Sequence, residues 1–235
     1  MQNFSAIRAI TLDLDDTLWP VWPAIARAEA VLLQWLGEHA PRTATMLGST
    51  EAVRAIRVAV EREQPELRHD LSGLRRESIR RALRQAGDDP ALAEPAFALF
   101  FAQRQKVDLY DDALPALEFL AARWPVVALS NGNANVHTIG LGRFFHASLN
   151  VGSTGYAKPD VRMFQAAAQA AGVEPGQVLH VGDDALLDAA GALDAGMHAV
   201  WLNRQGVDWP AQGPAPHATV TDLHQLCALL QKAGH

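Results

Sequence analysis

Aspartates are grouped at two places in the chain. Asp13 and Asp15 lie two residues apart in the segment DLDDT. Asp183 and Asp184 follow the apolar segment LHVG, and Asp188 lies one helical turn further on. Carboxylates crowded together cannot all stay ionised without a counter-ion. Mg²⁺ is a hard cation that takes one or two carboxylates together with waters and a substrate phosphate. The pattern therefore predicts a Mg²⁺ site among these aspartates.

Two further polar clusters, Ser130–Asn131 and Lys158–Pro159, also follow apolar segments. Each gap between successive clusters, from Ser130 to Lys158 and from Lys158 to Asp183, is about the length of one strand–helix unit. Ligands of an open parallel sheet bind outside the carboxyl ends of its strands, so these clusters are expected to gather at one edge. A carboxylate nucleophile, a second carboxylate, a cation and a lysine suit transfer through an aspartyl-phosphate.

Taken singly, each cluster has an ordinary structural explanation. Asp16 or Thr17 can cap the next helix, and Gly-Asp pairs are common in turns. Ser130 can be a helix cap, and Lys158 can be a surface lysine. Four clusters in this order, each at the end of an expected strand, favour the functional interpretation.

The elements that must position these residues are of two kinds. From Pro20 to Lys106 the periodicity predicts amphipathic helices and no strand. From about Leu109 short apolar segments alternate with helices, which is typical of a parallel sheet. The expected strands are 6–14, 125–129, 147–151, 177–181 and 198–202, and the expected helices are 23–38, 49–64, 72–86, 90–106, 113–123, 160–171 and 185–195. The sequence predicts an α/β fold with a doubly wound parallel sheet (residues 1–19 and 109–235) and an all-helical insertion (20–108).

The composition excludes several classes of protein. With 235 residues, 49% apolar and 20% charged, the chain reads as a soluble globular protein. A net charge of −6 argues against a general nucleic-acid binder. No apolar stretch approaches the roughly 18 residues of a membrane span, and no secretory signal is visible, so we expect a cytoplasmic protein. The single cysteine, Cys227, excludes an internal disulfide. We expect a small-molecule partner and a monomer or homodimer.

The order DxDxT, S-N, K-P and GDxxxxD resembles that of the haloacid dehalogenase superfamily, and the helical insertion is similar to the first class of cap in that superfamily. The resemblance implies a Rossmann-like core, a mobile helical cap and bound Mg²⁺. It makes Asp13 the nucleophile and Asp15 the acid that protonates the leaving oxygen and then the base that activates water. Ser130, with Asn131 as helper, would bind the phosphoryl group, and Lys158 would steady its charge. Asp13, the Asp15 carbonyl and Asp183 would hold Mg²⁺, supported by Asp184 or Asp188.

Asp15 helps to choose among members of the superfamily. The resemblance implies no acid at this position in the dehalogenases, because a halide leaves without a proton. The ATPase branch has Thr there. Asp15 therefore favours a phosphatase or a phosphomutase.

Longer strings are similar to bacterial phosphatases that act on FMN and on 5-amino-6-(5-phospho-D-ribitylamino)uracil. These strings are EREQPELRHDLSGLRRESI, LSNGNA and HVGDDALLDAAGALDAGM. Substrate contacts are predicted at Thr17 in the core and at His69, Arg75 and Arg76 in the insertion, where a solvated helix face is the alternative. Trp19 and Trp22 would either stack on a substrate ring or pack at the hinge of the cap.

Other functions stay open at this point. A sugar phosphomutase would need the cap to exclude water, and a dehalogenase would belong to the same superfamily. A non-enzymatic phospho-acceptor switch also uses an Asp at a strand end with Mg²⁺, although Asp15 and the large insertion argue against it.

Overall fold

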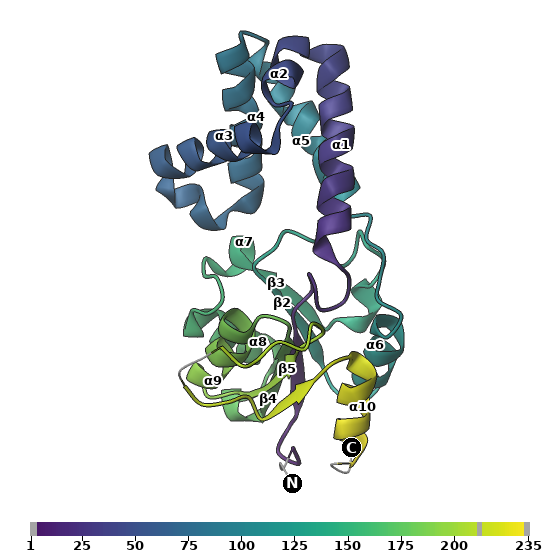
Figure 1. Ribbon diagram of the computed structural model, residues 1–235. Helices are drawn as coiled ribbons and strands as arrows, with labels where there is room; N and C mark the ends of the chain where they lie inside the picture. Colours follow the sequence, from purple (N-terminus) through teal and green to yellow (C-terminus); the bar gives the residue numbers. More distant parts are fainter. Residues whose placement is uncertain (1–3, 211–212, 233–235) are drawn as a thin grey trace. The chain divides into compact units, whose positions relative to one another are not determined.

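Six parallel strands form the central sheet (Figure 1). The computed structural model describes residues 4–210 and 213–232. The strands are β1 (Ala9–Leu12), β2 (Val126–Ser130), β3 (Ala147–Asn150), β4 (Val178–Gly182), β5 (His198–Leu202) and β6 (Ala218–Val220). Their order is β3-β2-β1-β4-β5-β6, so the chain winds outward in both directions from β1. This is the doubly wound order, and the predicted fold class is confirmed.

Helices cover both faces of the sheet (Figure 1). α6 (Ala113–Ala121) packs against α10 (Leu223–Lys232) on one face. α8 (Val161–Ala171) and α9 (Gly191–Asp194) lie on the other, and the short α7 (Val151–Thr154) follows β3. The core under α8 is apolar and mostly small, which lets the helix lie close to the strands. Its helical members include Met163, Phe164, Ala167 and Ala168.

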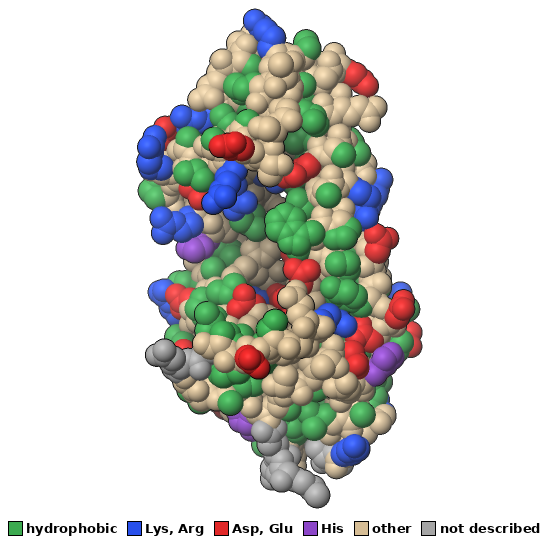
Figure 2. Space-filling view, viewed as in Figure 1, with side chains coloured by type: hydrophobic (Ala, Val, Ile, Leu, Met, Phe, Trp, Pro, Cys, Tyr) green, Lys and Arg blue, Asp and Glu red, His purple; other side chains and the backbone are tan. Residues whose placement is uncertain are grey.

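The helical insertion, Val21–Val107, is a second compact unit. Its helices are α1 (Val21–His39), α2 (Pro41–Met46), α3 (Thr50–Glu63), α4 (Leu71–Ala86) and α5 (Ala93–Arg104). α1, α4 and α5 supply its core, which includes Leu32, Leu36, Ile79, Leu83, Phe97 and Phe100. Many Lys and Arg side chains lie on the surface of this unit (Figure 2).

Local signals set the ends of these helices. The side chains of Ser49 and Asp70 accept from backbone N–H groups at the starts of α3 and α4. α4 ends at Gly87, whose φ of 74° is left-handed. The expected helix 90–106 begins instead with a 3₁₀ turn (Pro90–Leu92), because the Asp89 side chain caps Ala91.

Some elements differ from those expected. The expected helix 185–195 begins as a π-helical turn, η5 (Ala185–Ala190), and continues as α9. α2 and β6 were not predicted, because segments of six and three residues are too short to show a period. No helix among the described residues combines the length and the apolar composition that crossing a bilayer requires.

Candidate active site

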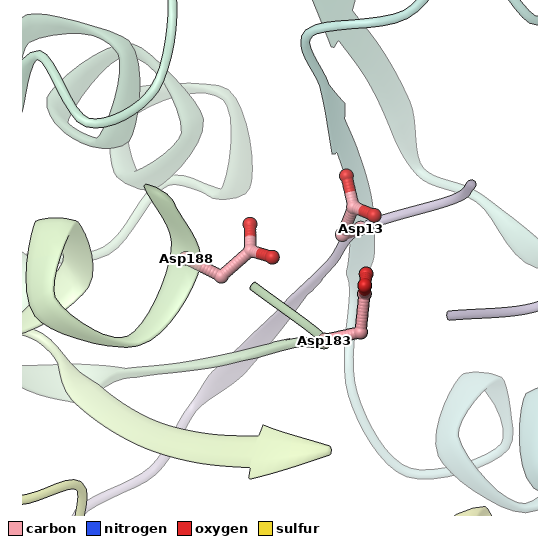
Figure 3. Close-up of side chains that lie close together, drawn as sticks. All are labelled: Asp13, Asp183 and Asp188. Carbon is pink, nitrogen blue, oxygen red and sulfur yellow. The ribbon is translucent and has the colours of Figure 1, made fainter. Parts of the chain in front are cut away.

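Three carboxyl groups meet beyond the carboxyl end of the sheet (Figure 3). Asp13 follows β1, Asp183 directly follows β4, and Asp188 points toward them from η5. One oxygen of each lies within 4.8 Å of the others. A metal ion could therefore contact all three carboxylates at once. Among residues 4–210 and 213–232, no other group of three acidic, His or Cys side chains is this compact.

Lys158 lies between two of these carboxylates. Its Nζ atom is 2.5 Å from Oδ1 of Asp13 and 2.5 Å from Oδ1 of Asp188, and its side chain is 3% exposed. Burial alone would lower the pKa of Lys158, but the charges of Asp13 and Asp188 outweigh burial and raise it. Lys158 is therefore a permanent cation that two carboxylates share.

The site holds more negative charge than Lys158 can balance. Burial, with the charges of Asp188 and Asp183, raises the pKa of Asp13 well above its ordinary value despite Lys158. Burial, with the charges of Asp188 and Asp16, raises the pKa of Asp183 to about 7. Asp188 differs, because Lys158 and His180 outweigh its burial and hold its pKa well below the usual range. Oxygen donors with an excess of negative charge fit a hard divalent cation.

His180 and Thr11 support Asp188 from within the sheet. His180 Nε2 lies 3.2 Å from Oδ1 of Asp188, and Nδ1 lies 2.8 Å from Oγ1 of Thr11. Burial lowers the pKa of His180, so the ring is neutral, and an ionised Asp188 requires the proton on Nε2. Nδ1 then accepts from the Thr11 hydroxyl. Both residues are fully buried register partners of β1 and β4.

Neither His180 nor Thr11 is among the residues that the sequence pattern singles out. A signal was present, because residues 11 and 13 of an extended segment point to the same face of a sheet. A polar residue on that face, two positions before the expected nucleophile, needs a buried partner.

Asp184 and Asp188, which the sequence could not tell apart, have different contacts. Oδ1 of Asp184 accepts from the N–H groups of Leu186 and Leu187, so this carboxylate caps η5. Asp188 instead belongs to the carboxylate cluster, and its Oδ2 accepts from the Asp184 N–H at 3.0 Å. Both oxygens of Asp188 therefore have nitrogen donors from the protein.

Gly182 makes the approach of Asp188 possible. A Cβ at position 182 would lie 2.3 Å from Cγ of Asp188, closer than side chains tolerate. We expect Gly182→Ala to displace Asp188 from Lys158, to lower the free energy of unfolding by about 1–3 kcal/mol and to reduce turnover at least about tenfold. Urea unfolding and steady-state kinetics measure both effects.

Gly176→Ala is the matched control for this prediction. A Cβ there would meet its nearest neighbour, the Gly196 carbonyl oxygen, at 3.9 Å, which is ordinary contact. If Gly182→Ala behaves like Gly176→Ala, the close approach of Asp188 does not matter to the site.

The loop after Asp13 is held by side-chain contacts of its own. Oδ1 of Asp15 accepts from the indole N–H of Trp19 at 2.8 Å. Trp19 is fully buried, which excludes one of its two expected roles, stacking on a substrate ring. Trp22 is 73% exposed and belongs to the insertion. The Thr17 hydroxyl donates to Oδ1 of Asp183 at 3.1 Å, so the structure gives Thr17 a contact with an acid of the cluster.

Ser130 and Asn131 stand at the end of β2, beside β1. Ser130 is buried, and its Oγ accepts from the Gly132 N–H at 2.9 Å. The Asn131 amide bonds to the backbone of Lys158 on both sides: Oδ1 accepts from its N–H at 2.7 Å, and Nδ2 donates to its carbonyl at 2.9 Å. Asn131 therefore positions Lys158, and its expected contact with phosphate stays a prediction.

Two of the three residues of the insertion that were predicted to contact substrate have ion-pair partners inside that unit. Arg75 pairs with Glu29 at 3.1 Å and lies over the ring of Phe100. Arg76 pairs with Glu94 at 3.1 Å and lies over the ring of Phe97. His69 is exposed at the end of a 3₁₀ turn (Pro65–His69). Contacts of these three side chains with substrate stay predictions.

Known proteins share both the sequence and the fold of this chain. A sequence model described as "Hydrolase: haloacid dehalogenase-like hydrolase" matches residues 7–196. The 5-amino-6-(5-phospho-D-ribitylamino)uracil phosphatase YigB of Escherichia coli is 34% identical over 232 residues, covering 95% of this chain and 96% of that protein. The phosphoserine phosphatase of Thermus thermophilus is 31% identical over 252 residues, covering 94% of this chain and 98% of that protein.

Among solved structures, a protein titled 2-haloacid dehalogenase from Pseudomonas syringae pv. Tomato is 38% identical, with a TM-score of 0.89. The match covers 96% of this chain and 99% of that one. The family and the two phosphatase-named relatives support a phosphomonoesterase. The predicted resemblance is confirmed, and the chain belongs to the haloacid dehalogenase-like hydrolase family.

Proposed function

We propose that this enzyme is a Mg²⁺-dependent phosphatase that cleaves a small phosphorylated metabolite through a covalent phosphate on Asp13. The observation that carries the proposal is the contact of Asp13 with Lys158 at 2.5 Å, inside a cluster of carboxylates that needs a cation. A carboxylate held in this way is a nucleophile for phosphorus, and the charges around it suit the phosphoryl oxygens.

Asp13, Asp183 and the Asp15 carbonyl are the groups that we propose to hold the metal ion. Asp188 is better suited to orient Lys158, because its two oxygens already accept from protein nitrogens. Asp184 caps η5 and supports the turn. When bound, Mg²⁺ would supply positive charge to the phosphoryl oxygens and to the crowded carboxylates.

In the first half-reaction a carboxylate oxygen of Asp13 attacks phosphorus and forms an acyl phosphate. The bond between phosphorus and the ester oxygen breaks, and Asp15 gives its proton to the departing alkoxide. Trp19 fixes the Asp15 carboxyl group through its indole N–H. Lys158 donates to the phosphoryl group, and the Ser130 hydroxyl, which accepts from Gly132, can donate its hydrogen there.

In the second half-reaction water attacks the phosphorus of the acyl phosphate. Asp15, now ionised, takes a proton from that water. The bond between phosphorus and the Asp13 oxygen breaks, which releases inorganic phosphate and restores the Asp13 carboxylate. The sum is one ester and one water consumed, with one alcohol and one phosphate formed.

The substrate that we propose is a flavin-pathway phosphate, either FMN or 5-amino-6-(5-phospho-D-ribitylamino)uracil. The support is the match with the phosphatase of the second compound, which extends over 95% of this chain and therefore includes the insertion. A cytoplasmic location, a role in riboflavin metabolism and a monomeric or homodimeric state go with this proposal as predictions.

An activity panel with Mg²⁺ tests the proposal. It contains FMN, the ribitylamino-uracil phosphate, phosphoserine, p-nitrophenyl phosphate and 2-chloropropionate, because relatives are named for phosphatase and for dehalogenase activity. We expect phosphate release from the flavin-pathway compounds with the highest kcat/KM, and none after chelation of the metal. Halide release without phosphate release would overturn the phosphatase, and preference for phosphoserine would overturn only the substrate.

The metal-free protein is expected to lose stability as the pH rises from about 4 to about 7. The pKa of Asp183 is raised to about 7 by burial and neighbouring acids, above the ordinary value of 3.8. The folded state therefore binds more protons than the unfolded state between these values. The raised pKa does not affect the free energy of unfolding below the unfolded pKa. Above it, the free energy of unfolding falls as the pH rises, and the full loss, of the order of 2–4 kcal/mol, is reached above about pH 7.

Urea unfolding at several pH values, with chelator and with Mg²⁺, measures this loss. Mg²⁺ is expected to stabilise the protein more at pH 8 than at pH 5, since it neutralises acids that are ionised at the higher pH. Asp183→Asn is the control, and it should flatten the pH dependence and reduce the effect of Mg²⁺. An equal effect of Mg²⁺ at both pH values would contradict the assignment of Asp183 to the metal.

A further inference from the structure

Arg204 contacts several separate segments of the core, outside the carboxylate cluster. It lies two residues after β5, and both of its terminal nitrogens donate to Asp112: Nη1 to Oδ2 and Nη2 to Oδ1, each at 2.9 Å. Nη2 also donates to the Thr17 carbonyl at 2.9 Å. The guanidinium carbon lies 4.0 Å from the centre of the Tyr110 ring. Of the basic side chains, only arginine can make all of these contacts together, because its planar guanidinium carries several N–H donors in a fixed fork.

Asp112 is fixed from a second direction. Its Oδ2 also accepts from the Leu223 N–H at 2.7 Å, at the start of α10. The Asp112 side chain is 7% exposed and that of Arg204 is 18% exposed, so the pair is shielded from water. Burial alone would raise the pKa of Asp112, but the N–H groups of Arg204 and Leu223 outweigh burial and lower it. Asp112 is therefore an ionised carboxylate with N–H donors from two directions.

The segments that Arg204 joins lie on either side of the helical insertion in the sequence. Thr17 comes shortly before the insertion leaves the core, and Tyr110 and Asp112 come shortly after the chain returns. The Tyr110 N–H donates to the Leu18 carbonyl at 2.9 Å, so the two segments are also bonded to each other. One arginine thus ties the loop after Asp13 to the segment that leads into α6.

This loop is also the one that contacts the carboxylate cluster. Thr17, whose carbonyl accepts from Arg204, donates its hydroxyl to Asp183. The backbone of Asp183 is held in turn by Trp201 of β5, whose indole N–H donates to its carbonyl at 2.8 Å. Asp16 in the same loop has a φ of 57°, an unfavourable conformation for most residues that the surrounding contacts must maintain. Thr17 therefore connects Arg204 to the carboxylate cluster directly.

We propose that Arg204 and Asp112 are a positioning pair that holds the Asp13–Thr17 loop, and through Thr17 the Asp183 carboxylate, in the geometry that binds the metal and the phosphoryl group. The inference rests on the proposed function for its kinetic consequence. Its structural consequence, order in the Asp13–Thr17 loop, does not depend on the reaction.

Arg204→Lys tests the pair, because it keeps the charge and removes the fork that reaches Asp112 and Thr17 together. The control is Arg162→Lys, since Arg162 also donates to an aspartate, Asp160, and lies 4.0 Å from a tyrosine ring centre, but stands 58% exposed on α8. Three quantities are measured on the full chain: hydrogen exchange at all of its amides, Mg²⁺ binding by calorimetry, and kcat and KM for p-nitrophenyl phosphate. Urea unfolding of each variant gives the unfolding midpoint.

For Arg204→Lys we expect faster exchange confined to residues 13–19 and 108–112, Mg²⁺ binding weakened about fivefold, and kcat lowered about tenfold with KM within about twofold. The control should leave all three unchanged. If Arg204→Lys lowers only the unfolding midpoint, or speeds exchange evenly over the whole core, the pair is merely structural and the proposal is wrong.

Asp112→Asn is the second variant in case Arg204→Lys does not fold. It keeps one acceptor oxygen, and we expect the same changes at smaller size. Wild-type protein without phosphatase activity would overturn the proposed function alone, because loop exchange and Mg²⁺ binding still test the pair. Unchanged exchange and Mg²⁺ binding in both folded variants would overturn the positioning pair alone.

Discussion

Asp13→Asn is expected to lower kcat for phosphate esters by at least about 10⁴-fold while leaving the protein folded. An amide cannot attack phosphorus to form an acyl phosphate, so the covalent path closes. The fold should survive, because Lys158 keeps Asp188 as a partner at 2.5 Å. The substitution also removes a buried carboxyl group whose pKa is raised by burial and by the charges of Asp188 and Asp183, so the charge repulsion at this position is lost.

Acid quenching during turnover, followed by mass spectrometry, measures the phosphorylated peptide that contains Asp13. We expect that peptide in the wild type and not in Asp13→Asn. The control is Asp16→Asn, which neutralises a neighbouring acid outside the cluster, and Asn tolerates the left-handed conformation of this position. Retention of a tenth or more of the wild-type kcat by Asp13→Asn would exclude Asp13 as the nucleophile.

The sequence predicts the site region well because strand ends are easy to recognise. Apolar segments followed at once by DLDDT, SN and GDD place polar residues at one edge of a parallel sheet, whatever the exact bounds of each strand. Lys158 was expected at a strand end, and this is wrong, because β3 ends at Asn150 and α7 lies between that strand and Lys158. It reaches Asp13 because Asn131, at the end of β2, bonds to its backbone on both sides.

The sequence could not distinguish Asp184 from Asp188, because their roles depend on the shape of one turn. A regular helix was expected from residue 185, but the chain makes the π-helical turn η5. In this turn Asp188 lies against Gly182, while Asp184 caps the turn with its own side chain. π-turns have no simple sequence signal and occur often at functional sites.

Contacts between distant segments were also beyond sequence reasoning. Arg204 and Asp112 are separated by 92 positions, and nothing in the local pattern of either residue points to the other. Trp19 was considered for ring stacking because an aromatic residue next to an active-site motif has that option. The structure buries the ring and uses its N–H for Asp15, and only the packing of the core determines that outcome.

Lys158→Met is expected to cost about 3–5 kcal/mol of unfolding free energy near neutral pH and to lower kcat about 10³-fold or more. The substitution leaves Asp13 and Asp188 buried without their shared cation. In the wild type the lowered pKa of Asp188 contributes stability above its unfolded pKa, and this contribution is lost as the pH falls through the folded value. Without Lys158 burial raises that pKa instead, so the variant should be least stable relative to wild type at neutral pH and should approach it in acid.

A second substitution separates charge from chemistry in this prediction. Lys158→Met combined with Asp188→Asn removes one carboxylate along with the cation, so it should recover part of the lost stability and none of the lost activity. Lys232→Met, an exposed lysine in α10, is the control and should match the wild type in both measurements. Urea unfolding between about pH 4 and pH 8 and steady-state kinetics give the result.

If Lys158→Met alone is as stable as the wild type at neutral pH, Lys158 does not balance these carboxylates. A double variant that regains turnover would mean that Lys158 acts on the fold of the site rather than on the phosphoryl group.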